Sequence, residues 1–554
     1  MTISTKLQKY WNPRQRRVLR EYLTAYLFIL PASLIIFVFG LFPVAFAFFV
    51  SLHDWRRFPD EYLGMDNYAE ALGGFGYVLF VWIGVGLLVY AGAVLWPFLR
   101  RTILAKQTEG AALLLPGVAW GVACATLIHY IFTLLIRVLD VPNRMPRGLQ
   151  RDRSLFIDEF LNSFTFPEVI DGGNALLMSL ILAGLTSLVL LRIRHADIIG
   201  DLLRVAGATL AIIGGVWLLW LTWQAGDAAV QAAREDGENL PIWSYIVFIS
   251  LGALLLWLAF WLWQRGVQAE SDRRFVLLVA GALAAAVAGY ILIAELPPAL
   301  AEADDDLLQG FWVTVLYVLG TVPFQLGIGL GLAYLLFHVR RGKAGFRIVY
   351  FLPYITPFAA TAIVFSTFFS RRADSPINRI VGLVGIEEQK WLSEPTPINE
   401  LILGTDLPQL LEGPGLALVV IMLSSTWTYI GYDVVIFMAG LGNIPNEYYE
   451  AARIDGASGW RVFRHITLPL LSPTTFFLSL IAIIGTFQAF TQIWMMRQPA
   501  ADDAVDTVGV YLFETVSART DLGYGSAMAF VLFGAILLLT IFQNRVLGRR
   551  VFYG

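Results

Sequence analysis

The sequence has 554 residues, of which 57% are hydrophobic and only 15% are charged. Its mean hydropathy is +0.67. Soluble domains carry about 25% charged residues, so this composition argues against an ordinary soluble enzyme and predicts a protein that lies in lipid. The net charge of −3 excludes the basic balance that nucleic-acid binding usually requires. The single cysteine, Cys124, excludes an intrachain disulfide and a cysteine-based metal cluster.

Twelve apolar stretches are long enough, or nearly so, to cross a bilayer as helices, which takes about 20 residues. They lie at 23–50, 76–97, 111–136, 175–191, 205–223, 243–264, 275–294, 311–337, 347–369, 416–439, 472–495 and 527–544. The first is too long for a signal peptide and lacks a clear cleavage site, so we interpret it as a retained helix. The predicted fold class is an all-α, polytopic integral membrane protein.

The charges of the connecting loops test both the number of helices and their orientation, because cytoplasmic loops retain Lys and Arg. With the N-terminus inside and twelve helices alternating, the inside segments hold 25 of the 39 basic residues, and the outside loops hold 32 of the 42 acidic ones. If one helix were missed, every later loop would be assigned to the opposite side of the membrane, and this separation of charges would be lost. We therefore predict twelve spans with both termini cytoplasmic. Asp433 is the one carboxylate within a span. It could pair with a partner subunit or bind a cation, but its place near the end of the span favours contact with headgroup water, which we expect.

Polar side chains at membrane depth are candidates for a transport pathway. In the tenth stretch four of them share one helical face by their spacing of i, i+3, i+4 and i+7: Ser425, Thr428, Tyr429 and Tyr432. The eleventh stretch adds Thr486 and Gln488. Ser and Thr also hold packed membrane helices together, and tyrosine often marks the membrane interface. Both interpretations therefore stay open.

The cytoplasmic connection between these two stretches, residues 441–468, is longer than most. Glu447 to Asp455 favours a helix, Gly456 permits a sharp break, and Asp455 or Ser458 could cap a second short helix. Three side chains of that second helix recur every three residues and share one side: Trp460, Phe463 and Ile466. An aromatic side of this kind suits docking into a groove on another protein.

This loop resembles the EAA loop of binding-protein-dependent ABC importer permeases. The matching residues are Glu450-Ala451-Ala452, Asp455-Gly456-Ala457, Phe463, Ile466, Leu468-Pro469 and Pro473. Flanking motifs, such as Gly345-Phe346-Arg347 and Gly485-Thr486-Phe487, narrow the resemblance to sugar permeases similar to the larger membrane subunit of maltose and glycerol-phosphate importers. One departure is Met496-Arg497-Gln498-Pro499, where relatives usually carry a Thr-x-Gly-Gly-Pro loop.

The resemblance covers about 1–72 and 307–554. We therefore predict three regions. Residues 1–72 hold an N-terminal tail, the first core helix and an outside loop, and residues 301–554 hold five further core helices with the coupling loop 441–468. Between them, residues 73–300 form an insertion of about six helices without a match to the family, and its role stays open.

The resemblance implies a permease subunit that forms half of a pathway for a carbohydrate similar to maltose or another oligosaccharide. It implies no catalytic residue and no metal site, and it places sugar contacts on the helices that carry Ser425 and Thr486. Its coupling contact to an ATPase would comprise Glu450, Ala451, Ala452, Asp455, Gly456, Ala457, Trp460 and Phe463. The chain lacks a P-loop, because Gly342-Lys343 is followed by Ala344, so ATP and Mg would be bound by partner ATPase subunits.

Further partners implied by the resemblance are a second permease subunit, an ATPase dimer and an extracellular or periplasmic sugar-binding protein, in a bacterial-type plasma membrane. The alternative is a twelve-helix secondary transporter coupled to an ion gradient. That class predicts two similar halves and ion-coupling charges at mid-membrane, and the sequence shows no such repeat. A membrane-embedded glycosyltransferase would need an acidic pair at a loop, which no spacing supports.

Overall fold

The computed structural model describes residues 13–56, 58–104, 112–146, 152–188, 198–237, 240–269, 271–339, 341–404 and 412–551. The start of the N-terminal tail, residue 111 and residues 189–191 of the predicted spans lie outside these ranges. Within them, ten helices are long and apolar enough to cross a membrane, or up to 12 if each of two bent helix pairs is one span. The predicted all-α, polytopic fold class is confirmed.

The chain divides into two compact units, which we describe separately. The first comprises Met1–Asn67, Phe75–Ala294 and Asp521–Ala527. The second comprises Tyr68–Gly74, Glu295–Thr520 and Met528–Gly554. The three-region division at residues 72 and 300 is not tested by this result and stays a prediction.

The first unit opens with an apolar segment made of α2 (Pro13–Ile36), the π-helical turn η1 (Phe37–Leu41) and α3 (Phe42–Val50). A hairpin follows, in which β1 (His53–Trp55) pairs antiparallel with β2 (Pro59–Tyr62), and α4 (Asp66–Leu72) crosses the unit boundary. The remaining elements are α5 (Phe75–Leu104), α7 (Leu114–Leu139), α8 (Val141–Arg144), α9 (Arg153–Asn162), η2 (Ser163–Thr165), α10 (Pro167–Ser187), α11 (Ile198–Glu235), α12 (Ile242–Val267) and α13 (Asp272–Ile293).

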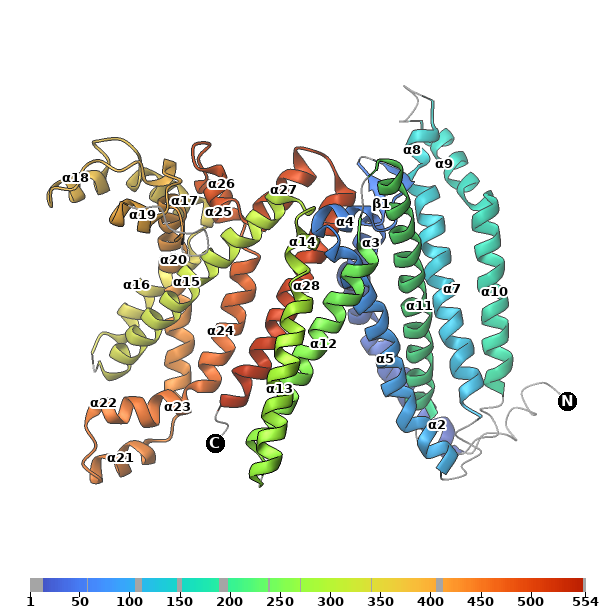
Figure 1. The fold of residues 1–554 in the computed structure, drawn as a ribbon, viewed down its shortest axis with the longest axis horizontal. Helices are drawn as coiled ribbons and strands as arrows, with labels where there is room; N and C mark the ends of the chain where they lie inside the picture. The colour runs from blue at the N-terminus through green and yellow to red at the C-terminus, as the bar shows by residue number, and fades with distance from the viewer. Residues whose placement is uncertain are drawn as a thin grey trace. The chain divides into compact units, whose positions relative to one another are not determined.

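Small residues let the helices of the first unit pack closely. Helix α12 packs on α13, α11 packs on α5, and α7 lies between α10 and α11 (Figure 1). A Cβ atom added to Gly252 of α12 would lie 3.0 Å from the carbonyl oxygen of Gly289 in α13. Such close approach is the usual packing of helices in lipid. Large side chains such as Trp96, Trp220 and Trp257 are exposed, as expected where lipid is the solvent.

The second unit is built around α20 (Leu416–Gly442), which packs against α15 (Asp305–His338), α16 (Lys343–Ile355) and α24 (Ser472–Phe487). In the most apolar window of α20, 56% of the residues are buried, against 44% for α15 and no more than 28% for the other eight long helices. The other elements are α14 (Leu296–Leu300), α17 (Phe358–Phe368), α18 (Pro376–Gly382), η4 (Trp391–Ser393), α19 (Ile398–Leu403), α21 (Asn446–Ile454), α22 (Gly459–Val462), η6 (Phe463–Thr467), α23 (Leu468–Leu470), α25 (Thr491–Met496), α26 (Asp502–Val505), α27 (Val508–Ser517), α28 (Leu522–Val546, in this unit from Met528) and η7 (Gly548–Arg550).

Two predicted spans differ from straight helices. The ninth is bent by 93° between α16 and α17, because Pro357 follows Thr356 and the residue before a proline is driven out of the helical region (ψ 132° at Thr356). The eleventh was predicted to run to residue 495, but α24 ends at Phe487 and a separate short helix, α25, follows. A further bend of 63° separates residues 459–470 from α24.

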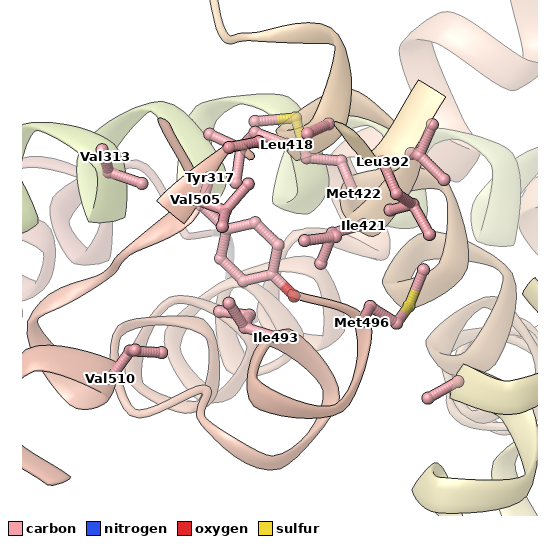
Figure 2. Close-up of a cluster of buried hydrophobic side chains, with 14 residues drawn as sticks. Val313, Tyr317, Leu392, Leu418, Ile421, Met422, Ile493, Met496, Val505 and Val510 are labelled. Carbon is pink, nitrogen blue, oxygen red and sulfur yellow. The ribbon is translucent and has the colours of Figure 1, made fainter. Parts of the chain in front are cut away.

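Two apolar clusters hold α20 at its two ends. Near its start, Leu418, Ile421 and Met422 pack with side chains of α15, α25 and α26 (Figure 2). Near its end, Val434, Phe437 and Leu441 pack with Ala333 and Leu336 of α15 and with Leu471 and Leu478. The polar residues of α20 lie between these clusters.

Candidate functional site

A cavity of about 240 Å³ lies among α15, α17, α20, α24 and α25, between the two apolar clusters of the second unit. Its polar lining residues are Tyr317, Thr321, Gln325, Ser425, Tyr429, Tyr432, Asp433, Thr486, Gln488, Thr491 and Gln492. Sites for drug-sized ligands span about 300–1,000 Å³. The cavity therefore suits a small ligand, or one part of a larger one.

Five of the six residues predicted for a substrate pathway line this cavity: Ser425, Tyr429, Tyr432, Thr486 and Gln488. The sixth, Thr428, does not. It is fully buried, and its hydroxyl donates a hydrogen bond to the carbonyl oxygen of Ser424 at 2.9 Å. The hydroxyl of Thr428 is therefore bonded within its own helix, and a place for Thr428 on the pathway stays a prediction. Contact of the other five with a ligand stays a prediction.

The polar face of α15 was not among the site residues predicted from the sequence. Tyr317, Thr321 and Gln325 are spaced by four residues, so they lie on one side of the helix, and Gly329 continues the line. The three polar side chains are at least 97% buried and line the cavity. The signal was present in the sequence as a polar residue at every fourth position of an otherwise apolar helix.

A buried hydrogen-bond network lies beside the cavity and includes three of its lining residues, Tyr317, Ser425 and Gln492. The hydroxyl groups of Tyr317 and Ser425 are hydrogen-bonded, and Ser425 donates to the side-chain oxygen of Gln492 at 3.0 Å. The amide nitrogen of Gln492 donates in turn to Ser424 at 2.6 Å. Satisfied networks of this kind rigidify their surroundings, so this one fixes α15, α20 and α25 beside the cluster of Figure 2.

The rings of Phe358, Tyr429 and Tyr432 line another part of the cavity. The ring of Tyr354 in α16 lies 5.1 Å from that of Tyr432 and 6.0 Å from that of Tyr429. Phe358 of α17 lies 6.1 Å from Tyr429. The bend between α16 and α17 thus brings rings from two short helices against the tyrosines of α20.

Asp433 does not reach headgroup water, so that expectation is wrong. Its side chain is buried (2% exposed) against α15, where a Cβ added to Gly329 would lie 2.8 Å from the Cβ of Asp433. Its Oδ2 atom has no hydrogen-bond partner in the described part of the chain. The distance of Asp433 from the end of its span suggested exposure, but the helix turns this side towards α15.

The predicted coupling loop forms two short helices, α21 and α22. Gly456 adopts a left-handed conformation (φ +70°), and the amide of Ala457 bonds back to the carbonyl of Ala452 at 2.9 Å. This is how a glycine commonly ends a helix. The second helix begins after Ser458, so Ser458 and not Asp455 occupies its N-cap position.

The residues predicted to contact an ATPase fall into two groups. Glu450, Ala451, Asp455, Gly456 and Trp460 are exposed, with Trp460 at 67%. Ala452 is buried, and Ala457 and Phe463 are half-buried. The Phe463 ring packs between Trp460, at 5.5 Å, and Tyr334 of α15, at 4.7 Å. Phe463 therefore anchors the loop to the membrane helices, while Trp460 and the nearby Ile454 (87% exposed) present an apolar surface.

The departure at Met496-Arg497-Gln498-Pro499 has a structural consequence. The guanidinium group of Arg497 contacts Glu514 of α27 at 2.5 Å and Asp506 at 2.8 Å. Nearby, Tyr511 donates a hydrogen bond to Asp304 at 2.7 Å. Burial and this bond raise the pKa of Tyr511 above its ordinary value. Arg497 thus ties together α25, α27 and the segment between them.

Comparisons with known proteins identify the second unit. A family model described as "Binding-protein-dependent transport system inner membrane component" matches residues 325–553. The probable ABC transporter permease protein YesP of Bacillus subtilis is 33% identical over 242 residues, which cover 43% of this chain and 71% of that protein. The arabinooligosaccharides transport system permease protein AraP of the same organism is 31% identical, over 43% of this chain and 68% of its own length.

Among solved structures, a bacterial ABC transporter involved in the import of the acidic polysaccharide alginate is 20% identical, with a TM-score of 0.39 over 44% of this chain and 80% of that chain. The relatives in Bacillus subtilis share more than 30% identity over more than two thirds of their length. The match decides between the two transporter classes left open by the sequence. This chain belongs to the family of inner membrane components of binding-protein-dependent transport systems, as an ABC transporter permease.

Proposed function

We propose that this chain is the permease subunit of an ATP-driven importer and forms half of a transmembrane pathway for a carbohydrate. The cavity between the apolar clusters of α20 carries the proposal, because it joins aromatic faces to hydroxyl and amide groups at membrane depth. Burying polar groups inside a membrane costs free energy, so polar groups that gather around a cavity there indicate a ligand site or a pathway. An oligosaccharide similar to maltose is the substrate we infer from the sequence resemblance.

Two relatives support a carbohydrate substrate. AraP is named for arabinooligosaccharides, and the lactose transport system permease protein LacF of Rhizobium radiobacter is 28% identical over 246 residues. The cavity of about 240 Å³ is small for an oligosaccharide. A second permease subunit would therefore supply the other side of the pathway, and an extracellular or periplasmic binding protein would deliver the sugar.

Coupling to ATP is proposed to run through α21 and α22. The exposed side chains of Ile454 and Trp460 provide an apolar surface for a groove on an ATPase subunit, which would bind ATP and Mg. An amphipathic helix resting on the membrane surface is the competing interpretation. Glu447, Glu450 and Asp455 oppose it, because anionic headgroups would repel their charges. Docking to an ATPase requires this loop, and with it both termini, to be cytoplasmic.

The turn at Gly456 provides the test. In Gly456→Val a β-branched side chain would occupy a left-handed conformation, at a cost of about 1–3 kcal/mol, so the angle between α21 and α22 would change. We expect at least about a tenfold loss of ATP-driven uptake in vesicles, with normal amounts of the complex in the membrane. The probe in this uptake assay is a labelled oligosaccharide, chosen because it binds the partner sugar-binding protein.

Gly459→Ala is the matched control, because Gly459 has no left-handed conformation and a Cβ there would meet no heavy atom within 4 Å. It should preserve uptake. Unchanged uptake by Gly456→Val would contradict the coupling role of the loop. Uptake of the sugar without ATP would contradict the importer as a whole.

A further inference from the structure

In the described part of the chain, the lining of the cavity in the second unit carries an acidic group but no basic one. It includes one carboxylate, Asp433, and no Lys, Arg or His among the described residues. A ligand's phosphate, sulfonate or carboxylate group would therefore be buried without a counter-ion from this chain. Burial of an unpaired charge is costly, and more so beside a charge of the same sign.

Three lining side chains have hydrogen-bonding capacity to spare. Thr321, Gln325 and Asp433 are 1%, 3% and 2% exposed. Each has a buried oxygen without a hydrogen-bond partner in the part of the chain that the structure describes: Oγ1, Oε1 and Oδ2, respectively. Buried polar atoms are normally paired, so three such atoms around one cavity indicate groups that a ligand or ordered water completes.

The three groups lie along one stripe where α15 packs against α20. Thr321 and Gln325 are one turn apart on α15, and Gly329, the next position of that stripe, is covered by Asp433 of α20. The amide oxygen of Gln325 and an ionised Asp433 accept hydrogen bonds, and the Thr321 hydroxyl can accept or donate. A ligand that complements this stripe must therefore supply several donors.

We propose that Thr321, Gln325 and Asp433 select the transported ligand by its charge. They bind a neutral or positively charged polyhydroxylated compound through its O–H or N–H groups, and the cavity rejects a compound that carries a phosphate, sulfonate or carboxylate. This assignment rests on the proposed function, because it names the ligand class of the same cavity.

The charge preference of the cavity can be measured without knowing the substrate. In a chain with Cys124→Ala, Gly485→Cys places a thiol in the cavity wall, where an added Cβ meets no heavy atom within 4 Å. Vesicles with the whole importer are treated with a methanethiosulfonate bearing a trimethylammonium group, or with its sulfonate analogue, with and without ATP. The rate at which each reagent modifies the cysteine at position 485 is divided by its rate with 2-mercaptoethanol in solution. This division corrects for the different intrinsic reactivities of the two reagents.

At a pH that ionises Asp433, we expect the corrected rate of the cationic reagent to exceed that of the anionic one about tenfold, because a nearby carboxylate in a medium of reduced dielectric constant attracts the cation and repels the anion. Asp433→Asn should bring the ratio to about 1. Asp306→Asn at the start of α15 is the control, because that side chain is 68% exposed and lies outside the cavity lining, so the ratio should not change.

A cationic-to-anionic rate ratio of about 1 in the chain that carries only Cys124→Ala and Gly485→Cys would overturn the proposal. This outcome can be measured even if Asp433→Asn does not assemble. A ratio that survives Asp433→Asn, or a thiol that neither reagent reaches with or without ATP, would overturn it as well. Uptake measured on the same vesicles separates this proposal from the function. Sugar uptake with a ratio of about 1 refutes only the charge selection, whereas a tenfold ratio without ATP-driven uptake refutes only the importer.

Discussion

At Tyr317 a single hydroxyl group joins the apolar cluster at the start of α20 to the cavity. The ring belongs to the cluster, while the hydroxyl bonds Ser425 at the end of the network that includes Gln492. Tyr317→Phe keeps the ring and removes one buried hydrogen bond, which is worth about 0.5–1.5 kcal/mol. We expect a lower melting temperature of the purified complex, measured by thermal unfolding in detergent.

Tyr354→Phe is the comparison for this change, because Tyr354 is 38% exposed and contacts its neighbours through its ring. It should leave the melting temperature nearly unchanged. Equal effects of the two substitutions would mean that the buried network does not hold α15 and α20 together.

Single residues of the cavity were predictable only in part. Ser425, Tyr429 and Tyr432 were found from their spacing, because polar groups on one face of an apolar helix are visible in the sequence. Asp433 was misinterpreted, since its distance from the end of the span says nothing about the direction of its side chain. That direction depends on the neighbouring α15, whose Gly329 makes room for the carboxylate.

Among the elements, the contact between α16 and α20 depends on one missing side chain. A Cβ added to Gly431 would lie 1.8 Å from the carbonyl oxygen of Tyr350, so no side chain fits there without moving α16. Gly431→Ala should destabilise the fold by about 1–3 kcal/mol or more and displace Tyr354 from the rings of Tyr429 and Tyr432. Reduced yield of monodisperse protein on gel filtration would report this.

The control for Gly431→Ala is Gly442→Ala at the end of the same helix, where an added Cβ meets no heavy atom within 4 Å. It should give a normal yield. Normal behaviour of Gly431→Ala would show that α16 can shift without loss of packing.

Element boundaries were predicted less well than element existence. Length and apolar content located the ninth stretch, but one continuous apolar run does not reveal that Pro357 turns the chain by 93°. Prolines within membrane helices are often tolerated, because neighbouring helices satisfy the freed backbone groups. The end of α24 at Phe487 is likewise hidden, because the residues after it remain apolar enough to continue a span.

For the whole molecule, the polarised loop charges make the orientation testable. A cysteine at Gln268, between α12 and α13, should be on the cytoplasmic side, and one at Glu388, after α18, should be outside. Both positions are exposed. In intact cells with Cys124→Ala, a membrane-impermeant maleimide should label only the second. Labelling of the first before permeabilisation would contradict the predicted orientation.

The helix α20 joins the cavity to the coupling loop without an intermediate element. It has 27 residues, about 40 Å of helix, and ends at Gly442, shortly before α21 begins at Asn446. Thermodynamic linkage requires that if docking on the loop alters ligand affinity, the ligand alters docking by the same factor. A sugar in the cavity should therefore register as a changed dissociation constant of the ATPase, before any nucleotide is hydrolysed.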